Sequence, residues 1–281
     1  MNNFYQQYKG AIERFIDQAL QEDIEGHDHS SLACFDAALQ RKAELKVKED
    51  CVIAGISLAE KIFKHYDPSL SIEIFVPEGE ILRSGAVAFN VSGNAQSVLA
   101  TERLVLNCMQ RMSGIATKTH HFNSLIKHTS AKLLDTRKTL PGLRTAQKYA
   151  VKAGGCFNHR FGLYDAYLIK ENHINACGSI ELAVSTARQA NPRHPVEVEV
   201  ESLSQLDTAL QARADVIMLD NFTLEQLSEA VQLNAGRAKL EASGGISNET
   251  LVAIAETGVD YISLGTLTKD CKAVDLSLLF A

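Results

Sequence analysis

The stretch Val196-Glu-Val-Glu-Val-Glu-Ser-Leu-Ser-Gln-Leu-Asp-Thr-Ala-Leu-Gln-Ala-Arg-Ala-Asp-Val-Ile-Met-Leu-Asp220 decides the fold class of this 281-residue chain. It begins with the β-branched run 196–200, continues with apolar residues at helical spacing over 203–212, and returns to an apolar run at 216–219. Strand, helix and strand in this order form a βαβ unit, which implies a parallel sheet.

The same rhythm extends in both directions from this unit, over about residues 131–264. Several such units that close on themselves give a β/α barrel, and an open doubly wound sheet is the alternative. No Gly-x-Gly-x-x-Gly motif follows a strand, which disfavours a dinucleotide-binding fold. Further strands are expected at 131–134, 166–169, 240–242 and 261–264, and further helices at 144–153, 180–190, 224–233 and 248–257.

The residues before this region have a different pattern, in which short stretches of alternating apolar and polar residues are separated by glycines. This pattern predicts an α+β arrangement rather than a barrel. Strands are expected within 43–48, 71–76 and 86–91, and helices at 4–22, 57–66 and 97–128, the last of them broken near Ser113-Gly114.

The composition excludes several classes of partner. A formal net charge of −6 and the absence of Trp argue against binding to nucleic acid or to a membrane surface. No apolar run approaches the ~20 residues of a membrane span. The N-terminus lacks the features of a signal peptide, so we expect a cytoplasmic protein. The six cysteines have no Cys-x-x-Cys spacing, which disfavours a structural zinc site. We expect them to be reduced thiols. Only Cys156 lies near a histidine that could serve as its base.

The residues that follow each strand matter most, because a β/α barrel builds its active site where strands end. They sort by chemical type: cations follow the early strands, carboxylates lie on the middle strands, and small residues follow the last two. The alternative for any single position is that strand ends become polar simply because loops do. The residues are Asp135, Thr136, Arg137, Lys138, Lys170, Glu199, Asp220, Asn221, Ser243, Gly244, Gly245, Gly265 and Thr266.

A concentration of positive charge lies in the segment 135–172, which carries seven Lys and Arg against three Asp and Glu. Such a field in an acidic chain attracts small polyanions. Arginine suits the bidentate recognition of carboxylates, and lysine suits phosphate. The lysines of the expected helix 144–153 fit either this site or a solvated helix face. The candidate anion-binding side chains are Arg137, Lys138, His159, Arg160 and Lys170.

Alternation along the strand 196–200 places Glu197, Glu199 and Glu201 on one face. A carboxylate that points into a barrel is costly unless a cation, a metal or a sugar hydroxyl pairs with it. Glu199 is therefore a candidate ligand for a metal or a ribose, with Asp220 on the next strand as the second oxygen ligand. A solvated edge strand is the alternative.

A phosphate cradle is expected at Ser243-Gly244-Gly245, before a helix that we expect to begin near Ser247. Backbone N–H groups and a helix N-terminus would then meet at one point. Gly265, after the following strand, offers a second set of donors, and paired phosphate contacts on the last strands recur in β/α barrels. Each glycine alone is weak evidence, since tight turns need glycine anyway.

Taken in order, these motifs resemble the quinolinate phosphoribosyltransferases, also called nicotinate-nucleotide pyrophosphorylases. The resemblance covers roughly residues 12–275, and the Asp-Thr-Arg-Lys string with Asn-His-Arg is its most specific part. One departure lies at 26–31, where the family usually has a Gly-Asp-aliphatic-Thr stretch, and it puts only N-terminal details in doubt. The motifs are Asp135-Thr-Arg-Lys-Thr-Leu-Pro-Gly-Leu-Arg144, Asn158-His-Arg160, Leu168-Ile-Lys170, Val196-Glu-Val-Glu-Val200, Met218-Leu-Asp-Asn-Phe222 and Glu241-Ala-Ser-Gly-Gly-Ile246.

The resemblance implies an α/β protein: an N-terminal α+β open sandwich over 1–112, followed by an incomplete, seven-stranded β/α barrel over 113–270. The tail at about 271–281 is expected to pack back on the first domain. The resemblance also implies a homodimer, or a higher assembly such as a hexamer, in which the other subunit completes each site. By that analogy Arg103 reaches the partner's site, although from the sequence alone it is a helix-surface arginine.

The implied reaction converts quinolinate and phosphoribosyl pyrophosphate to nicotinate mononucleotide, CO2 and pyrophosphate, in de novo NAD biosynthesis. The resemblance assigns carboxylates and pyrophosphate to the cations, and the ribose with a Mg²⁺ ion to Glu199 and Asp220. Lys138, Glu199 and Asp220 are the expected catalytic residues. The expected substrate contacts are Arg103, Thr136, Arg137, Lys138, His159, Arg160, Lys170, Glu199, Asp220, Ser243, Gly244, Gly245, Ser263 and Gly265.

Three other interpretations stay open at this point. A paralogue of the same fold is tied to molybdenum transport, and Asn158-His-Arg160 with Leu168-Ile-Lys170 favours the quinolinate enzyme over it. A Schiff-base aldolase would use Lys170 as its nucleophile, and borohydride trapping with a carbonyl substrate would support it. A non-catalytic sensor of phosphate ligands is disfavoured by the complete set of cations, carboxylates and glycine loops.

Overall fold

The computed structural model describes residues 2–281, which form two compact units. Unit 1 contains the residues up to 120 together with 139–155 and 266–281. Unit 2 contains 121–138 and 156–265, so it is inserted in the sequence of unit 1.

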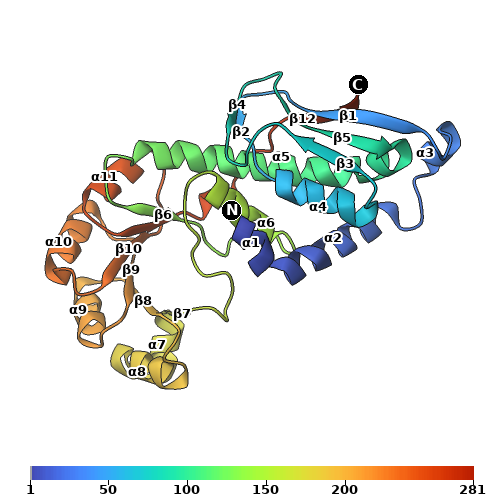
Figure 1. Ribbon diagram of the computed structural model, residues 1–281. Helices are drawn as coiled ribbons and strands as arrows, with labels where there is room; N and C mark the ends of the chain where they lie inside the picture. The colour runs from blue at the N-terminus through green and yellow to red at the C-terminus, as the bar shows by residue number, and fades with distance from the viewer. Residues whose placement is uncertain (1) are drawn as a thin grey trace. The chain divides into compact units, whose positions relative to one another are not determined.

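Unit 2 is built on six parallel strands in the order β6-β11-β10-β9-β8-β7 (Figure 1). Consecutive strands are neighbours from β7 to β11, without the reversal that defines a doubly wound sheet, and β6 then pairs with β11. The strands are β6 (Lys132–Leu134), β7 (Tyr167–Ile169), β8 (Val196–Val200), β9 (Val216–Asp220), β10 (Lys239–Ser243) and β11 (Tyr261–Ser263).

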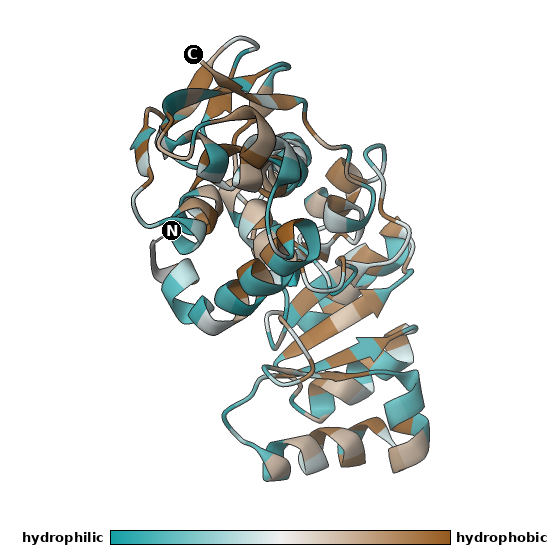
Figure 2. Ribbon diagram, turned by 90° about the vertical axis from the view of Figure 1, so that its right-hand side faces the viewer, coloured by the Kyte–Doolittle hydropathy of each residue, from teal (hydrophilic) through white to brown (hydrophobic). Residues whose placement is uncertain are grey.

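The helices between these strands begin at side chains that cap them. Ser179, Ser202 and Thr223 each accept a hydrogen bond from a backbone N–H three residues later, which satisfies a donor that the first turn leaves unpaired. In Figure 2 the strands are coloured mostly as apolar residues, whereas the helices contain both apolar and polar residues. The helices are α7 (Glu171–Cys177), α8 (Ile180–Ala190), α9 (Leu203–Gln211), α10 (Leu224–Asn234) and α11 (Leu251–Glu256).

The expected α/β class is confirmed, but the seventh strand of the barrel is reduced to a single parallel bridge between Leu134 and Phe157. The residues after Phe157 bond to side chains instead of to a strand. Asp165 accepts hydrogen bonds from the backbone N–H groups of Phe161 and Gly162. β7 therefore begins only after this turn, and it forms an edge of the sheet.

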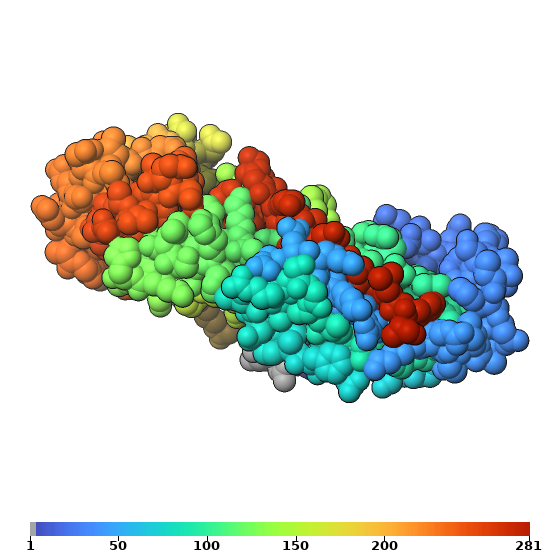
Figure 3. Space-filling view, turned by 90° about the horizontal axis from the view of Figure 1, so that it is seen from above, coloured from blue at the N-terminus to red at the C-terminus, as the bar shows by residue number. Residues whose placement is uncertain are grey.

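Unit 1 contains an antiparallel sheet in the order β12-β1-β5-β3 and a separate pair, β2-β4. The register joins Val47 to Leu276 and Ala43 to Phe280, so the last residues lie beside β1 (Figure 3, red beside blue). The strands are β1 (Gln40–Val47), β2 (Cys51–Val52), β3 (Ser71–Ile74), β4 (Ile81–Leu82), β5 (Val87–Asn94) and β12 (Leu276–Phe280).

The stretch 26–31, which departs from the family pattern, has a structural role. Asp28 accepts hydrogen bonds from the backbone N–H groups of Ser30 and Ser31 and so caps the helix that follows. The helices of unit 1 are α1 (Asn2–Gln7), α2 (Lys9–Ile24), α3 (His29–Cys34), α4 (Ile56–Tyr66), α6 (Arg144–Ala153) and α12 (Thr266–Lys269), and α5 (Ala95–Leu125) extends from unit 1 into the sequence of unit 2.

The expected break at Ser113-Gly114 is wrong, because α5 runs through both residues without interruption. The Ser113 hydroxyl accepts a hydrogen bond from the backbone N–H of Ala54 and donates one to its carbonyl oxygen. A Cβ atom at Gly114 would lie 2.0 Å from the carbonyl oxygen of Lys272. These small residues therefore allow neighbouring segments to approach the helix closely. Within residues 2–281, no helix has the length and apolar character needed to cross a membrane.

Candidate active site

A cavity of about 550 Å³ opens at the carboxyl ends of the strands of unit 2. This is where parallel β/α folds bind ligands, because loops and side chains from several strands converge there. Of the expected substrate contacts, the cavity brings together Thr136, Arg137, Lys138, His159, Arg160, Lys170, Glu199, Asp220, Ser243, Gly244 and Ser263.

One wall of the cavity is held in place by Asp135, which follows β6 and is 0% exposed. One oxygen of its carboxylate accepts from the side-chain amide of Asn158 at 2.7 Å, and the other accepts from the backbone N–H of His159 at 3.0 Å. The carboxylate thus fixes the loop that carries His159 and Arg160 beside the end of β6.

The cavity contains two guanidinium groups whose charges repel each other. Burial, and then the positive charge of Arg137, lower the pKa of Arg160. The Nε atom of Arg160 is buried, and it has no hydrogen-bond partner among the described residues. An anion between the two groups would relieve the repulsion and accept from this donor. The other three cations of the positive segment lie on α6 in unit 1 and are not among the lining residues: Arg144, Lys148 and Lys152.

The carboxylates of β8 and β9 form a second group at the mouth. Glu199 makes an ion pair with Lys170. Burial, and then the negative charge of Glu199, raise the pKa of Asp220. His173 accepts the backbone N–H of Lys170 through Nδ1 at 3.0 Å, so this histidine helps to begin α7. The charges of Lys170 and Lys138 only partly offset this rise in the pKa of Asp220, so the two carboxylates would still be stabilised by a further positive charge.

The loop after β10 provides backbone N–H groups with unusual geometry. Gly244 and Gly245 have φ angles of +92° and +58°, which only glycine adopts without strain. A Cβ atom at Gly244 would lie 2.1 Å from the side-chain oxygen of Asn221, so this position requires glycine. The expectation of a helix beginning near Ser247 is wrong, since α11 begins at Leu251 after a turn. Any anion site here would depend on the loop alone.

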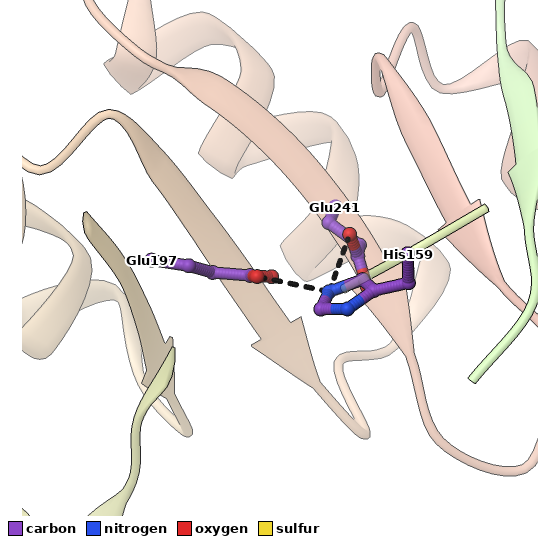
Figure 4. A group of neighbouring side chains, drawn as sticks. All are labelled: His159, Glu197 and Glu241. Atoms are coloured by element: carbon purple, nitrogen blue, oxygen red, sulfur yellow. Dashed lines mark ion pairs between the residues drawn. The ribbon is translucent and has the colours of Figure 1, made fainter. Parts of the chain in front are cut away.

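Three largely buried titratable side chains, those of His159, Glu197 and Glu241, point toward one another (Figure 4), and His159 and Glu241 also line the cavity. The Nε2 atom of His159 lies 2.9 Å from Oε2 of Glu197 and 3.6 Å from Oε2 of Glu241. Its Nδ1 atom accepts the backbone N–H of Arg160 at 2.8 Å. Both ring nitrogens of His159 are thus engaged with protein atoms.

Sequence comparison agrees with this arrangement. Residues 28–113 match the N-terminal domain, and residues 115–279 the C-terminal domain, of the quinolinate phosphoribosyl transferases. The chain belongs to this family. A nicotinate-nucleotide pyrophosphorylase [carboxylating] of Mycobacterium leprae is 41% identical to it over 94% of this chain and 95% of the relative. A quinolinate phosphoribosyltransferase [decarboxylating] of Nicotiana tabacum is 42% identical over 92% of this chain and 79% of the relative.

Solved structures of the family share the whole architecture. The nicotinate-nucleotide pyrophosphorylase of Francisella tularensis superposes with a TM-score of 0.92 at 42% identity, covering 97% of this chain and 96% of that one. The protein of the same name from Ehrlichia chaffeensis superposes with a TM-score of 0.89 at 33% identity, covering 96% and 98%.

In this member of the quinolinate phosphoribosyl transferase family, the buried cluster is a poor metal site, although its ligand atoms lie within 4.8 Å of one another. Because Nδ1 of His159 accepts a backbone N–H, the ring proton lies on Nε2, the atom that faces the carboxylates. A metal ion needs that nitrogen without its proton. Glu199 and Asp220 fit a hard cation better, because both are partly open carboxylates at the cavity mouth.

Three expected contacts lie outside the cavity lining. Gly245 follows the lining residue Gly244, and a Cβ atom at Gly265 would lie 2.8 Å from Cδ of Lys138, so Gly265 makes room for that side chain. Arg103 is an exposed residue of α5 in unit 1, whereas all the lining residues belong to unit 2.

Four lining residues were not among the expected contacts: Leu168, Met218, Asn221 and Glu241. The sequence could have indicated Glu241 as a site residue, because it is a carboxylate between two apolar residues of a strand, as Glu199 is. Cys156 lies outside the cavity lining, and burial raises the pKa of its thiol to about 12, which does not suit a thiolate nucleophile.

Replacement of Asp135 by alanine is expected to lower the free energy of unfolding by about 3 kcal/mol, because two donors lose a charged acceptor in a buried place. Urea denaturation measures the change. Asp23, an exposed aspartate of α2, provides the matched control, and its alanine variant should unfold like the parent protein. Equal stability of both variants would contradict the role of Asp135 in holding the 158–160 loop.

Proposed function

We propose that this chain transfers the phosphoribosyl group of phosphoribosyl pyrophosphate to the nitrogen of quinolinate and then releases CO2, giving nicotinate mononucleotide for NAD biosynthesis. The single observation that carries the proposal is that four cations, the carboxylates of Glu199 and Asp220 and a glycine loop surround one cavity, in a chain of this family.

The cations account for the anionic groups of both substrates. Arg137 and Arg160 are close enough to repel, so they can hold one carboxylate between them in bidentate fashion. Lys138 and Lys170 line the same cavity and supply compact charges for the second carboxylate and for pyrophosphate. The buried Nε donor of Arg160, which has no hydrogen-bond partner among the described residues, favours a substrate that places a carboxylate there.

The carboxylates account for the ribose. Glu199 and Asp220 accept hydrogen bonds from its hydroxyl groups and face the positive charge that develops on the ring as pyrophosphate departs. They also fit the Mg²⁺ ion that accompanies phosphoribosyl pyrophosphate, and this ion would neutralise the leaving group. The loop at Ser243 and Gly244 then binds the 5′-phosphate through its N–H groups.

The protein's part in the first step is positioning. With the pyridine nitrogen and the ribose carbon held a few ångströms apart, attack becomes effectively unimolecular. Once bonded to ribose, the ring nitrogen is cationic and stabilises the electron pair left by the departing 2-carboxylate.

We also propose that the active unit is a homodimer in which Arg103 of one subunit binds substrate in the partner's cavity. Arg103 is exposed on α5 and is not one of the residues that line the cavity, which supports this role. A cytoplasmic location likewise remains a prediction.

Incubation of the purified protein with quinolinate, phosphoribosyl pyrophosphate and Mg²⁺ tests the function. We expect equal amounts of CO2, pyrophosphate and nicotinate mononucleotide. Nicotinate in place of quinolinate should give no product, and product formed from nicotinate instead would overturn the proposal. Borohydride trapping of a carbonyl substrate on Lys170 would favour an aldolase, but Lys170 is ion-paired with Glu199, whereas a Schiff base needs an unpaired amine.

A further inference from the structure

Glu241 is a buried acid in the wall of the cavity with no part in the binding scheme above. It is 1% exposed, and it nevertheless lines the cavity. Its Oε1 atom is buried, with no hydrogen-bond partner among the described residues. An ionised carboxylate in such a place is costly, so the group needs either a cation or a proton.

The neighbours of Glu241 do not provide a full positive charge. From β8 it faces the carboxylate of Glu197, from the 157–166 loop it faces His159, and from β11 the hydroxyl of Ser263. From β9 it has Met218 beside it in register. Burial, and then the charge of Glu197, raise the pKa of Glu241 to about 8. Glu241 therefore holds a proton at neutral pH.

The strand register places Glu241 within reach of the reacting ring. Glu199 of β8 and Glu241 of β10 both lie beside Met218 of β9, so they are at the same level of the sheet and two strands, or about 10 Å, apart. Both line the cavity. Met218 lies between the two acids and also lines the cavity, so a pyridine ring bound here would lie within reach of both of them.

The proposed reaction needs one proton at this carbon. The bond from C2 to the 2-carboxylate breaks, CO2 leaves, and the electron pair stays on C2 beside the cationic nitrogen. A proton must then replace the carboxylate, or CO2 recombines. We propose that Glu241 is the acid that delivers this proton to C2. Glu241 becomes a carboxylate and regains a proton from solvent when the product leaves, so each turnover consumes one proton.

Other candidate donors in the wall are less suited. Asp220 also has a raised pKa, but in the proposed scheme its carboxylate binds the ribose hydroxyls. Leu168 and Met218 carry no acidic proton, and the hydroxyl groups of Thr136, Ser243 and Ser263 are too weakly acidic. Lys170 is ion-paired with Glu199 at the mouth. His159 directs its Nε2 proton at Glu197 and Glu241, so it acts through Glu241 by orienting the carboxyl group.

The inference rests on the proposed function, and the variant Glu241→Gln tests it. Glutamine keeps the shape but cannot donate a proton of this acidity. In a single turnover with carboxyl-labelled quinolinate, we expect pyrophosphate release at the parent rate, release of CO2 slowed by about 10²-fold, and accumulation of quinolinate mononucleotide. Circular dichroism and a thermal melt establish that the variant is folded.

The pH dependence distinguishes a proton donor from a structural residue. The acid form is required, so in the parent protein the rate of CO2 release should be constant below, and fall above, a pH of about 8, the pKa of Glu241. The Glu241→Gln variant should lack this alkaline limb. Glu197→Gln is the matched control, because it removes a charge that raises the pKa of Glu241. In this variant the rate of CO2 release should still fall with rising pH, but the fall should begin at a lower pH than in the parent protein.

The outcomes separate the two proposals. If the parent protein forms no nicotinate mononucleotide, the proposed function fails. If it does, but Glu241→Gln releases CO2 at the parent rate with the alkaline limb intact, the function stands and the role of Glu241 is overturned. A folded Glu241→Gln variant that has lost pyrophosphate release equally would also overturn it, because Glu241 would then serve binding or positioning.

Discussion

Replacement of Arg137 by alanine is expected to lower kcat/KM for quinolinate by about 10²- to 10³-fold, the cost of removing one partner of a desolvated charge pair. Arg137 lines the cavity, and its charge is felt by Arg160. Without Arg137, one carboxylate of the bound substrate would be held by Arg160 alone. The loss should fall mainly on the KM for quinolinate, with a smaller effect on the KM for phosphoribosyl pyrophosphate. Steady-state kinetics with each substrate varied in turn measures this.

Two controls sharpen the result for Arg137. Arg137→Lys keeps the charge but loses the planar fork, so it should recover only part of the activity. Arg193→Ala removes an exposed arginine outside the cavity lining and should have no effect. An unchanged KM for quinolinate in Arg137→Ala would contradict the assignment of this side chain to a substrate carboxylate.

Mixing two inactive variants is expected to restore activity if the dimer shares its sites. Arg103→Ala should lack the residue given to the partner, and Arg137→Ala should lack the one kept in its own cavity. After random reassociation half of the dimers are mixed, and each mixed dimer contains one intact site of two. About a quarter of the parent activity should therefore return. Dissociation at low protein concentration followed by an assay at high concentration measures it.

The control for the mixing experiment pairs Arg137→Ala with Asp220→Asn. Both changes affect the cavity of the same chain, so a mixed dimer still has one cavity with each defect, and no activity should return. If Arg103→Ala is fully active alone, or if its mixture with Arg137→Ala stays inactive although mixed dimers form, the sharing of sites is contradicted.

The strand ends were the most predictable part of the molecule. Residues 196–200 form β8 with the bounds that the alternation gave, and Glu199 lies at the cavity as the carboxylate rule required. Such positions follow from local periodicity and from the cost of burying charge. The predicted bounds of the helices 144–153 and 180–190 also match the structure, because apolar residues recur at helical spacing in both, and Ser179 caps the second.

Other features depend on contacts between distant segments, and local patterns could not reveal them. A serine followed by a glycine is typical of a helix break, but α5 continues through Ser113 and Gly114. These small residues instead allow residue 54 and residues 271–272 to approach the helix. The cations of α6 belong to unit 1, because the chain leaves unit 2 between residues 139 and 155. The role proposed for Glu241 depends on the positions of Glu197 and His159, which come from two other segments.

The pairing of β1 with β12 has a consequence for the newly made chain. The ribosome must synthesise the whole of unit 2 between these strands, and at ~5–20 residues per second that delay is on the order of ten seconds or more. During this interval one edge of β1 presents unpaired backbone groups, the kind of surface that joins strands of different molecules. The sheet of unit 1 can therefore be completed only after unit 2 has been synthesised. In a nascent chain that ends between β1 and β12, the open edge of β1 is the surface that a chaperone would have to cover.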